Sequence, residues 1–411
     1  MTAYRLDGSA DLLADPLAYT DESRLHAALT ELRSAAPVSL VHVPSYRPFW
    51  AITKHADILA IERANNLFIN APRPVLMRTE FEEQQAQIGV RTLIHADDPD
   101  HQALRSVGAN WFRPKAMRAL QNRVDELAKA YVDKMRAAGG SCDFARDIAV
   151  DYPLFVIMSL LGLPESDLPR MLKLTQELVG ADDPEMQRSG TPEEQMYALL
   201  EMFEYFNALT ASRRENPTDD LASAIANARI DGEYMSDIET VSYYVIIATA
   251  GHDTTSAAIS GGMRALIEHP DQQRRLRDDP SLMSLAAEEM IRWTTPVKGF
   301  MRTATEDTSV RGVPIAAGES VLLSYVSANR DEEAFDQPFR FDVARDPNHH
   351  LSFGNGVHFC MGAALARMEI RSLFTELLPR LSAVDFDGQP ELIATTFVGG
   401  HKHLPLRYSL Q

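Results

Sequence analysis

One cysteine stands in a setting that favours a thiolate metal ligand. Cys360 follows the glycine-punctuated run FGNGVHF at 353–359 and comes directly before a strongly helical stretch. The thiolate is the ligand form of cysteine, and a helix N-terminus with inward-pointing amides lowers the thiol pKa. Gly354 and Gly356 can adopt positive φ, so the loop can fold tightly beside a flat macrocycle. The pattern predicts that Cys360 binds the iron of a haem, although a lone cysteine is more often a small buried hydrophobe.

A second chemically active group interrupts an apolar helix predicted over 241–266. The run AGHDTT at 250–255 places a glycine, an acid and two hydroxyls in mid-helix. Glycine costs about 1 kcal/mol there, and Asp and Thr compete for backbone hydrogen bonds. We therefore expect a distortion that opens a groove for O₂, with Thr254 holding a water and Asp253 relaying protons. The alternative is that the threonines only bond back to the preceding turn.

Both motifs resemble those of the bacterial cytochrome P450 family. The pattern F-G-x-G-x-H-x-C-x-G is matched at every fixed position from Phe353 to Gly362, and A-G-x-[DE]-T-T is matched at 250–255. The resemblance covers essentially the whole chain. It implies a mainly α fold with small β-sheets, a triangular helical prism, and haem b with the Cys360 thiolate as proximal ligand. It also implies a monooxygenase that uses O₂, because peroxide-dependent relatives typically lack the acid–alcohol pair.

Further site residues are implied by the same resemblance. Anionic haem propionates need cationic or hydrogen-bonding partners. The residues assigned to cofactor binding are His101, Arg105, Arg302, His358, Phe353 and Gly362.

An E-x-x-R pair lies on a helix predicted over 281–292. Glu289 and Arg292 are three residues apart and share a helix face, where such a pair is usually an exposed ion pair worth little. The resemblance instead implies a buried structural triad behind the cysteine loop. Arg340 is the best third member by motif, ahead of Arg330 and Arg345.

The substrate is expected to be a small hydrophobic cyclic molecule, a monoterpenoid or an aromatic hydrocarbon. The segments RWTTPVK at 292–298 and SANRDEE at 327–333 are similar to those of bacterial P450s that hydroxylate α-terpineol. All but one of the residues at family pocket positions are apolar, which favours binding by burial. Those residues are Ile246, Thr249, Ala250, Val297, Phe300, Phe397 and Val398. Lys298 departs from the usual apolar neighbour and points either outward or toward a substrate oxygen.

The resemblance also implies a [2Fe–2S] ferredoxin and an NAD(P)H-dependent ferredoxin reductase as partners. A basic cluster could face the acidic ferredoxin, or it could be a solvated helix face. The cluster consists of Arg105, Arg113, Lys115, Arg118 and Arg123. The net charge of −18 argues against a nucleic-acid partner, because phosphate binding needs a basic surface.

Mostly helical elements must position these residues. Pro114 and Gly139 punctuate a helix over 114–135. Further helices are expected at 23–35, 54–64, 144–161, 165–178, 192–215, 236–268, 281–292 and 361–378, and strands at 48–53, 297–303, 320–323 and 392–398. The segments 68–96 and 179–192 lack a steady period and are candidate substrate-access lids.

The bulk properties favour one domain over residues 1–411 in a cytoplasmic protein. The chain is 45% hydrophobic and 24% charged, and no Gly-, Ser- or Pro-rich linker divides it. It shows no signal peptide and no 18-residue apolar run, so no membrane association is expected. Cys142 and Cys360 are too few for a disulfide framework, and Cys142 is expected only to pack.

Two other classes of function compete with the monooxygenase. A haem-thiolate sensor or carrier would use Cys360 without turnover, but it would have no need of Thr254 and Asp253. A helical scaffold without cofactor would leave the glycine–cysteine loop unexplained.

Overall fold

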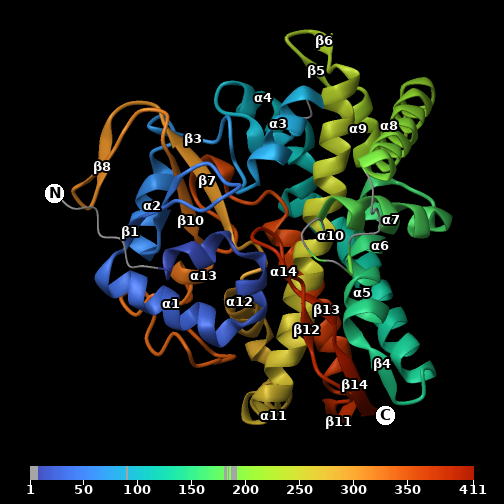
Figure 1. Ribbon diagram of the computed structural model, residues 1–411. Coiled ribbons are helices and arrows are strands. Elements are labelled where there is room, and N and C mark those ends of the chain that lie inside the picture. Colours follow the sequence, from blue (N-terminus) through green and yellow to red (C-terminus); the bar gives the residue numbers. More distant parts are fainter. Residues whose placement is uncertain (1–7, 89–90, 180–182, 184, 187–191) are drawn as a thin grey trace.

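The computed structural model describes residues 8–88, 91–179, 183, 185–186 and 192–411. The five-stranded sheet, the β8–β9 hairpin (Thr308–Ile315) and the N-terminal helices form one side of the molecule (Figure 1). A larger block of helices forms the other side, with the sheet of β4 (Ser141–Asp143), β11 (Leu381–Phe386) and β14 (Pro405–Leu410). The long helix α10, Asp237–Glu268, runs through the helical block. Among the described residues, no helix is long and apolar enough to cross a membrane.

Helices make up most of the structure. Their bounds are α1 Glu22–Ala35, α2 His55–Arg63, α3 Thr79–Ile88, α4 Asp100–Ala109, α5 Pro114–Ala137, α6 Asp151–Leu161, α7 Leu168–Val179, α8 Pro192–Glu215, α9 Leu221–Ala226, α10 Asp237–Glu268, α11 Pro270–Asp278, α12 Met283–Thr294, α13 Tyr325–Ala328 and α14 Ala363–Leu377.

The strands are short. Their bounds are β1 Val38–Val41, β2 Phe49–Ile52, β3 Phe68–Ile69, β4 Ser141–Asp143, β5 Arg229–Ile230, β6 Glu233–Tyr234, β7 Gly299–Ala304, β8 Thr308–Val310, β9 Val313–Ile315, β10 Ser320–Ser324, β11 Leu381–Phe386, β12 Glu391–Leu392, β13 His401–His403 and β14 Pro405–Leu410.

The largest sheet has the order β1-β2-β10-β7-β3. Its central strand, β10, pairs parallel with β2 and antiparallel with β7, so that Leu322 lies opposite both Ala51 and Met301. Apolar residues from both faces of this sheet are buried against α1 and α2. The sheet therefore fixes the start of β7, which follows the segment that borders the candidate site.

Local sequence signals explain the helices that carry the site. A capping box joins Ser236 and Glu239 at the start of α10, and each side chain satisfies a backbone amide of the first turn. Pro114 begins α5, and α6 ends at Gly162, which has a φ of 65°. Buried apolar residues of α5, α6, α10, α12 and α14 form one large core. That core holds α10 and α14 on the two sides of the cysteine loop.

Most predicted elements are present, with two informative differences. The predicted strand 392–398 is a strand only at β12; the rest is a loop that makes one isolated bridge between Val398 and Val297. The predicted helix 144–161 begins with a π-helical turn at Ala145–Ala149 before α6. Periodicity alone does not distinguish a loop that packs its apolar residues inward from a strand.

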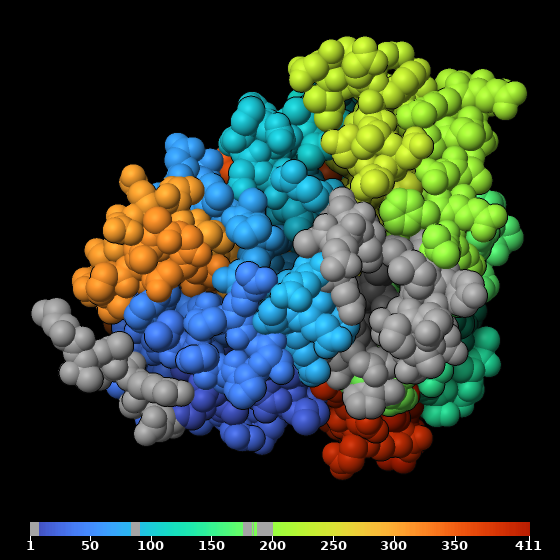
Figure 2. Space-filling view, turned by 45° about the horizontal axis from the view of Figure 1, so that its top comes forward, coloured from blue at the N-terminus to red at the C-terminus, as the bar shows by residue number. Residues whose placement is uncertain are grey.

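The two candidate lid segments are only partly described. Segment 68–96 contains β3, α3 and a 3₁₀ turn at Leu93–His95, while residues 89–90 lie outside the described part. Most of segment 179–192 also lies outside it. Figure 2 shows the described N-terminal residues, α3 and the β8–β9 hairpin on one side of the molecule, and α8 and α9 on the other.

Candidate active site

The loop before α14 carries Cys360 into a cavity. The amide of Cys360 donates to the Phe353 carbonyl at 2.9 Å, which closes the loop on itself. Gly354 and Gly356 have φ of 66° and 69°, the left-handed region that favours glycine. A Cβ at Gly356 would lie 2.4 Å from the Glu62 carbonyl oxygen. The second glycine is thus required by close contact with α2 rather than by the space beside a macrocycle.

The surroundings of the Cys360 thiol act on its pKa in opposite directions. Burial raises the pKa of Cys360, whereas the amides of Gly362 and Ala363 and the charges of Arg105 and Arg367 lower it. The expected amide effect is present, but burial outweighs it. A coordinating metal ion deprotonates a thiol outright, so a buried thiol of this kind suits a metal ligand better than a free nucleophile.

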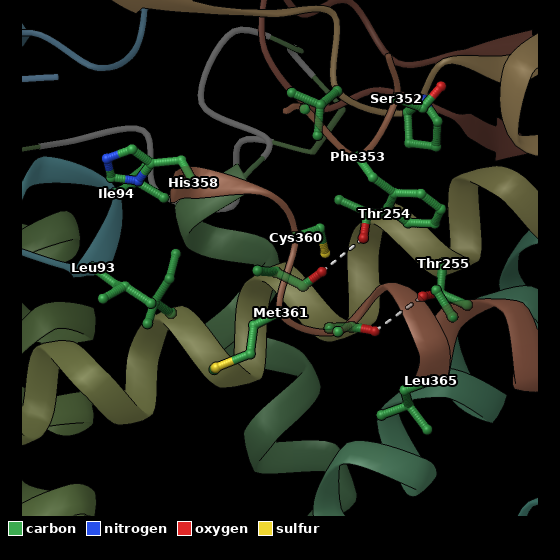
Figure 3. A pocket seen from close by; sticks show the side chains of 18 of the residues that line it. Leu93, Ile94, Thr254, Thr255, Ser352, Phe353, His358, Cys360, Met361 and Leu365 are labelled. Atoms are coloured by element: carbon green, nitrogen blue, oxygen red, sulfur yellow. Dashed lines mark hydrogen bonds between the residues drawn. The ribbon is translucent and has the colours of Figure 1, made fainter. Parts of the chain in front are cut away.

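Helix α10 forms the opposite wall of the same cavity (Figure 3). Thr254 faces Cys360 across the cavity, and its hydroxyl donates to the Ala250 carbonyl at 2.6 Å. Thr255 donates in the same way to Gly251 at 3.2 Å. α10 is continuous from Asp237 to Glu268, so the expected distortion does not break the helix. The back-bonding considered as the alternative is what the structure shows.

Gly251 has a packing role that the sequence did not reveal. A Cβ at this position would lie 2.3 Å from Cδ1 of Ile157 on α6. The glycine therefore lets the Ile157 side chain pack directly against the backbone of α10.

Asp253 faces a different cavity from Thr254. It lines a polar cavity together with Arg146 and His401, and its side chain is 17% exposed. One carboxylate oxygen lies 3.2 Å from Nδ1 of His252, and the other has no hydrogen-bond partner among the described residues. Consecutive residues of α10 thus face two cavities, one containing Cys360 and the other polar.

All six residues predicted to bind the cofactor line the cavity of Cys360. The His101 and His358 rings lie in contact, tilted by 39° with centroids 3.9 Å apart, and Arg105 donates to the Phe359 carbonyl at 2.6 Å. Burial and the neighbouring His101 lower the pKa of His358 to about 3; burial and Arg105 also lower that of His101. Both imidazoles are therefore neutral near pH 7 and can each donate one hydrogen bond.

The cavity fits a haem on three grounds. It has an empty volume of about 1370 Å³, its open mouth included. A Cβ at Gly362 would meet no atom closer than 4.0 Å, so there is open space next to Cys360. The buried Nε2 of His101 has no partner among the described residues, and it lies in the same cavity as Arg105 and Arg302. Two cations and an unpaired imidazole nitrogen suit the anionic propionates of a haem.

Comparison with known proteins decides the family. The family model described as "Cytochrome P450" matches residues 72–406. This chain belongs to the cytochrome P450 family. It is 41% identical to Cytochrome P450-terp of a Pseudomonas species, over 96% of each chain. The family's cofactor is haem b with a cysteine thiolate as proximal ligand, and the protein is a P450 monooxygenase.

Solved structures confirm the P450 fold. CYP108D1 from Novosphingobium aromaticivorans aligns with a TM-score of 0.90 at 40% identity, covering 98% of each chain. CYP268A2 from Mycobacterium marinum, solved in complex with pseudoionone, also aligns with a TM-score of 0.90, at 34% identity, covering 99% of this chain and 98% of that one. The predicted mainly helical P450 fold with small sheets is confirmed. The predicted resemblance to a terpineol-hydroxylating P450 is confirmed by the 41% identity to Cytochrome P450-terp.

The predicted substrate-pocket residues divide into two groups. Ile246, Ala250, Val297 and Phe300 line the P450 cavity. Three others do not: the Thr249 hydroxyl is bonded to Val245 within α10, the Phe397 ring packs edge-on against Phe300, and Val398 lines the cavity of Asp253. Sequence position cannot show which side chains of a loop face a cavity.

The third member of the buried triad is Arg345, so the prediction of Arg340 is wrong. Glu289 and Arg292 are fully buried and joined by two hydrogen bonds of 2.7 Å. Nε of Arg345 lies 3.1 and 3.2 Å from the two Glu289 oxygens. Arg340 is exposed, and only its backbone carbonyl reaches Arg345, at 2.8 Å. The chain turns after Phe341, which brings Arg345 and not Arg340 back to the acid.

Several cavity residues were missed from the sequence. Glu62 on α2 lines the P450 cavity, accepts a hydrogen bond from Tyr325 and lies 3.9 Å from Arg302. Burial raises the pKa of Glu62 to about 7 despite those two neighbours. Nothing in an amphipathic helix marks such a glutamate as buried. The apolar residues missed include Leu93, Ile94, Phe112, Ile157, Ile247 and Leu365.

Proposed function

We propose that this P450 hydroxylates a small hydrophobic cyclic substrate, a monoterpenoid or an aromatic hydrocarbon, with electrons from a [2Fe–2S] ferredoxin. The observation that carries the substrate class is the wall that faces Cys360. Ile246, Val297 and Phe300 present hydrocarbon to this space, and Leu93 and Ile94 close it from the candidate lid segment. Such a wall binds a compact hydrocarbon by removing its surface from water.

Cys360 is the proposed thiolate ligand of the haem. It lines the cavity, whereas Cys142 lies in β4, paired with Leu406 of β14. Haem bound there supplies the activation of O₂ and the transfer of one oxygen atom to a C–H bond. His101, Arg105 and Arg302 would hold the propionates, and His358, Phe353 and Gly362 would shape the loop side of the site.

Thr254 and Asp253 are the proposed proton-delivery residues. Thr254 presents its hydroxyl to the cavity of Cys360, and Asp253 faces the polar cavity on the other side of α10. The two residues are consecutive on α10 but face different cavities, so a proton taken up by Asp253 would reach a water held by Thr254 when the Asp253 side chain turns toward the cavity of Cys360. The Oδ2 atom of Asp253 is buried and has no partner among the described residues, so it can take up a proton without breaking another hydrogen bond.

Names of relatives support the substrate class without deciding it. Cytochrome P450-terp is similar over nearly the whole chain. CYP268A2 was solved in complex with pseudoionone, an open-chain ketone, which supports a small hydrophobic substrate but not a ring. Another relative, from Mycobacterium tuberculosis, is a methyl-branched lipid omega-hydroxylase at 35% identity. The competing expectation for this chain is therefore a long branched lipid.

Binding titrations separate the two substrate classes. We expect α-terpineol or a small aromatic hydrocarbon to change the haem absorption spectrum saturably, and a long methyl-branched fatty acid to bind much more weakly. Val297→Ala should weaken binding of the small substrate about tenfold, because two buried carbons are worth about 1.6 kcal/mol. Tighter binding of the fatty acid, or no effect at Val297, would remove the basis for the compact pocket.

The ferredoxin site is proposed at the start of α5. Arg113, Lys115 and Arg118 are exposed there, and Phe112 borders the Gly362 position. Phe359, next to Cys360, is 40% exposed and supplies an apolar centre. An acidic ferredoxin would be attracted by this charge in a chain whose net charge is otherwise negative.

Two members of the predicted basic cluster have other contacts. Arg123 binds Glu165 at 2.5 Å, and Arg105 lines the P450 cavity. The proposed docking surface is therefore limited to Arg113, Lys115 and Arg118.

A charge-reversal experiment tests the docking surface. Arg113→Glu with Lys115→Glu should slow reduction by ferredoxin about tenfold or more at low ionic strength. Lys129→Glu with Arg274→Glu makes the same change in net charge at exposed positions on α5 and α11 and should leave the rate nearly unchanged. Equal slowing by both pairs would mean that only net charge matters and that the docking site lies elsewhere.

The cytoplasmic location and the single-domain organisation over residues 1–411 stay predictions. Limited proteolysis of the haem-bound protein tests the latter, because separate domains would be released by cleavage at a linker.

A further inference from the structure

In addition to the P450 cavity and the polar cavity of Asp253, a cavity lined by Lys298 (the second cavity) lies behind one wall of the P450 cavity. It has an empty volume of about 1150 Å³, its opening included, between α1, the end of α10, the end of α12 and the β12–β13 hairpin. The two cavities share the segment 294–298: Pro296 and Val297 line the first cavity, and Thr294 and Lys298 line the second. Lys298 is therefore not placed to meet a substrate in the P450 cavity.

The charges around the second cavity do not balance. Arg264 binds Glu22 at 2.7 Å and Glu268 at 2.8 Å, and both of these carboxylates are partly exposed. Lys298 and Arg330 also line the cavity, and neither has an ion-pair partner among the described residues. Three basic side chains thus face two acidic ones. One positive charge is left over at a site that is partly shielded from water.

Backbone carbonyls compensate only part of this charge. Lys298 Nζ donates to the carbonyl of Thr295 at 3.0 Å, and Arg330 donates to that of Trp293 at 2.8 Å, both at the end of α12. A helix C-terminus carries about half a negative charge, less than either cation. Burial and the nearby Arg330 lower the pKa of Lys298 to about 8, as expected for an ammonium that lacks a full counter-charge.

Unpartnered polar groups point to a ligand in the same cavity. His401 borders both this cavity and the polar cavity of Asp253; it is 6% exposed, and neither of its ring nitrogens has a partner among the described residues. Nδ1 of His26 and Oγ1 of Thr294 are likewise buried without a described partner. Burial and the charges of Arg264 and Lys298 lower the pKa of His401 to about 3. Burial and the charge of Arg330 lower the pKa of His26 to about 3. Each imidazole is therefore neutral at pH 7 and keeps one N–H donor.

We propose that this cavity binds a small oxyanion, a phosphate or a carboxylate group, at a site formed by Lys298, His26, His401 and Thr294. A single negative charge balances the excess positive charge, and the N–H and O–H donors gain the acceptors that they lack. A cation is disfavoured by the charge, and a hydrocarbon would leave the donors unsatisfied. This site goes beyond the proposed monooxygenase function.

Occupancy of the site would link α1 to the wall of the P450 cavity. The Lys298 amide donates to the Phe397 carbonyl at 2.7 Å, and the Gly399 amide donates to Pro296 at 3.0 Å. An anion held between His26, Lys298 and His401 would join α1 to the hydrogen-bonded segments 296–298 and 397–399.

Equilibrium dialysis of the haem-bound protein tests the proposal. Radiolabelled inorganic phosphate and, separately, radiolabelled acetate are titrated at constant ionic strength maintained with sodium chloride. We expect saturable binding of one anion per chain. Phosphate alone, acetate alone or both in competition would each support an oxyanion site, and the preference identifies the group. The absence of saturable binding of either anion would show that water alone fills the cavity and would overturn the proposal.

Variants identify the site and control for folding. Lys298→Met should weaken anion binding at least tenfold, and His401→Leu, which removes donors without changing charge, should weaken it several-fold. Lys129→Met on the exposed side of α5 should leave it unchanged. An unaltered haem spectrum shows that each variant is folded; if Lys298→Met does not fold, His401→Leu decides. Binding that persists in either folded cavity variant would place the anion elsewhere and contradict the assignment.

Discussion

Replacing Arg345 with alanine should destabilise the protein far more than the same change at Arg340. In the structure, Arg345 is 9% exposed, binds the fully buried Glu289, and also donates to the Asp336 carbonyl at 2.7 Å. Removing one partner from a buried ion pair costs about 3–5 kcal/mol, because the other charge stays buried. Arg292 still binds Glu289 in the variant, so we take the lower value of about 3 kcal/mol. Arg340→Ala changes an exposed side chain and should cost less than about 0.5 kcal/mol.

Thermal unfolding of the two haem-bound variants measures this difference. A 411-residue chain has an unfolding entropy of about 0.9 kcal/mol per degree, so about 3 kcal/mol lowers the midpoint by about 3–4 °C. Arg340→Ala should shift it by less than 1 °C on the same scale. If the two variants unfold at the same temperature, or Arg340→Ala at the lower one, the triad built on Arg345 is refuted and the motif-based choice is restored.

Three further predictions follow from particular contacts. Gly356→Ala should lower the free energy of unfolding by several kcal/mol and reduce haem retention, because it adds a collision with the α2 backbone to a strained positive φ. The control Gly312→Ala, at φ 76° with open space around it, should lower the free energy of unfolding by only about 1–2 kcal/mol. Equal losses of stability in urea unfolding would contradict the close contact at Gly356. Thr254→Ala should still bind substrate, but it should form at least tenfold less product per NAD(P)H oxidised and release peroxide. Thr254→Ser keeps the hydroxyl and should be close to wild type. An unchanged ratio of product to NAD(P)H oxidised in the alanine variant would exclude the proton-delivery role. Burial alone would raise the pKa of Glu288, but hydrogen bonds from His350 and Arg367 lower this pKa to about 2. The ionised Glu288 carboxylate therefore stabilises the fold above pH 4.5, and this stabilisation is lost as the pH falls toward 2. Glu288→Gln should therefore lose less stability than wild type over that range, and identical pH profiles of the urea midpoint would count against this interaction.

The chemistry-bearing residues could be predicted from sequence because each lies in a short, contiguous motif. Cys360, Thr254 and the Glu289–Arg292 pair are each defined by neighbours a few residues away. The helices that carry them have strong local signals, such as Pro114 at the start of α5. For such residues, local spacing contains the information that decides their place, and the comparisons confirm the family that the motifs indicated.

Contacts between distant segments could not be predicted in this way. Arg345 reaches Glu289 because the chain turns back toward α12 after Phe341, and Arg340 offers the same residue type five positions earlier. Gly251 is set by Ile157, which is on a different helix. The direction of the Lys298 side chain does not follow from its neighbours in sequence, because the second cavity is built from four separate segments. A single sequence holds no local signal for any of these contacts.

The central claim is that Cys360 supplies the thiolate to a haem. The most direct measurement is the difference spectrum of the reduced, purified protein on adding carbon monoxide, recorded for wild type, Cys360→Ala and Cys142→Ala. We expect a strongly red-shifted Soret band in wild type and in Cys142→Ala, and its loss in Cys360→Ala. A red-shifted band that survives in Cys360→Ala, or the absence of any haem signal in haem-replete wild type, would contradict the account.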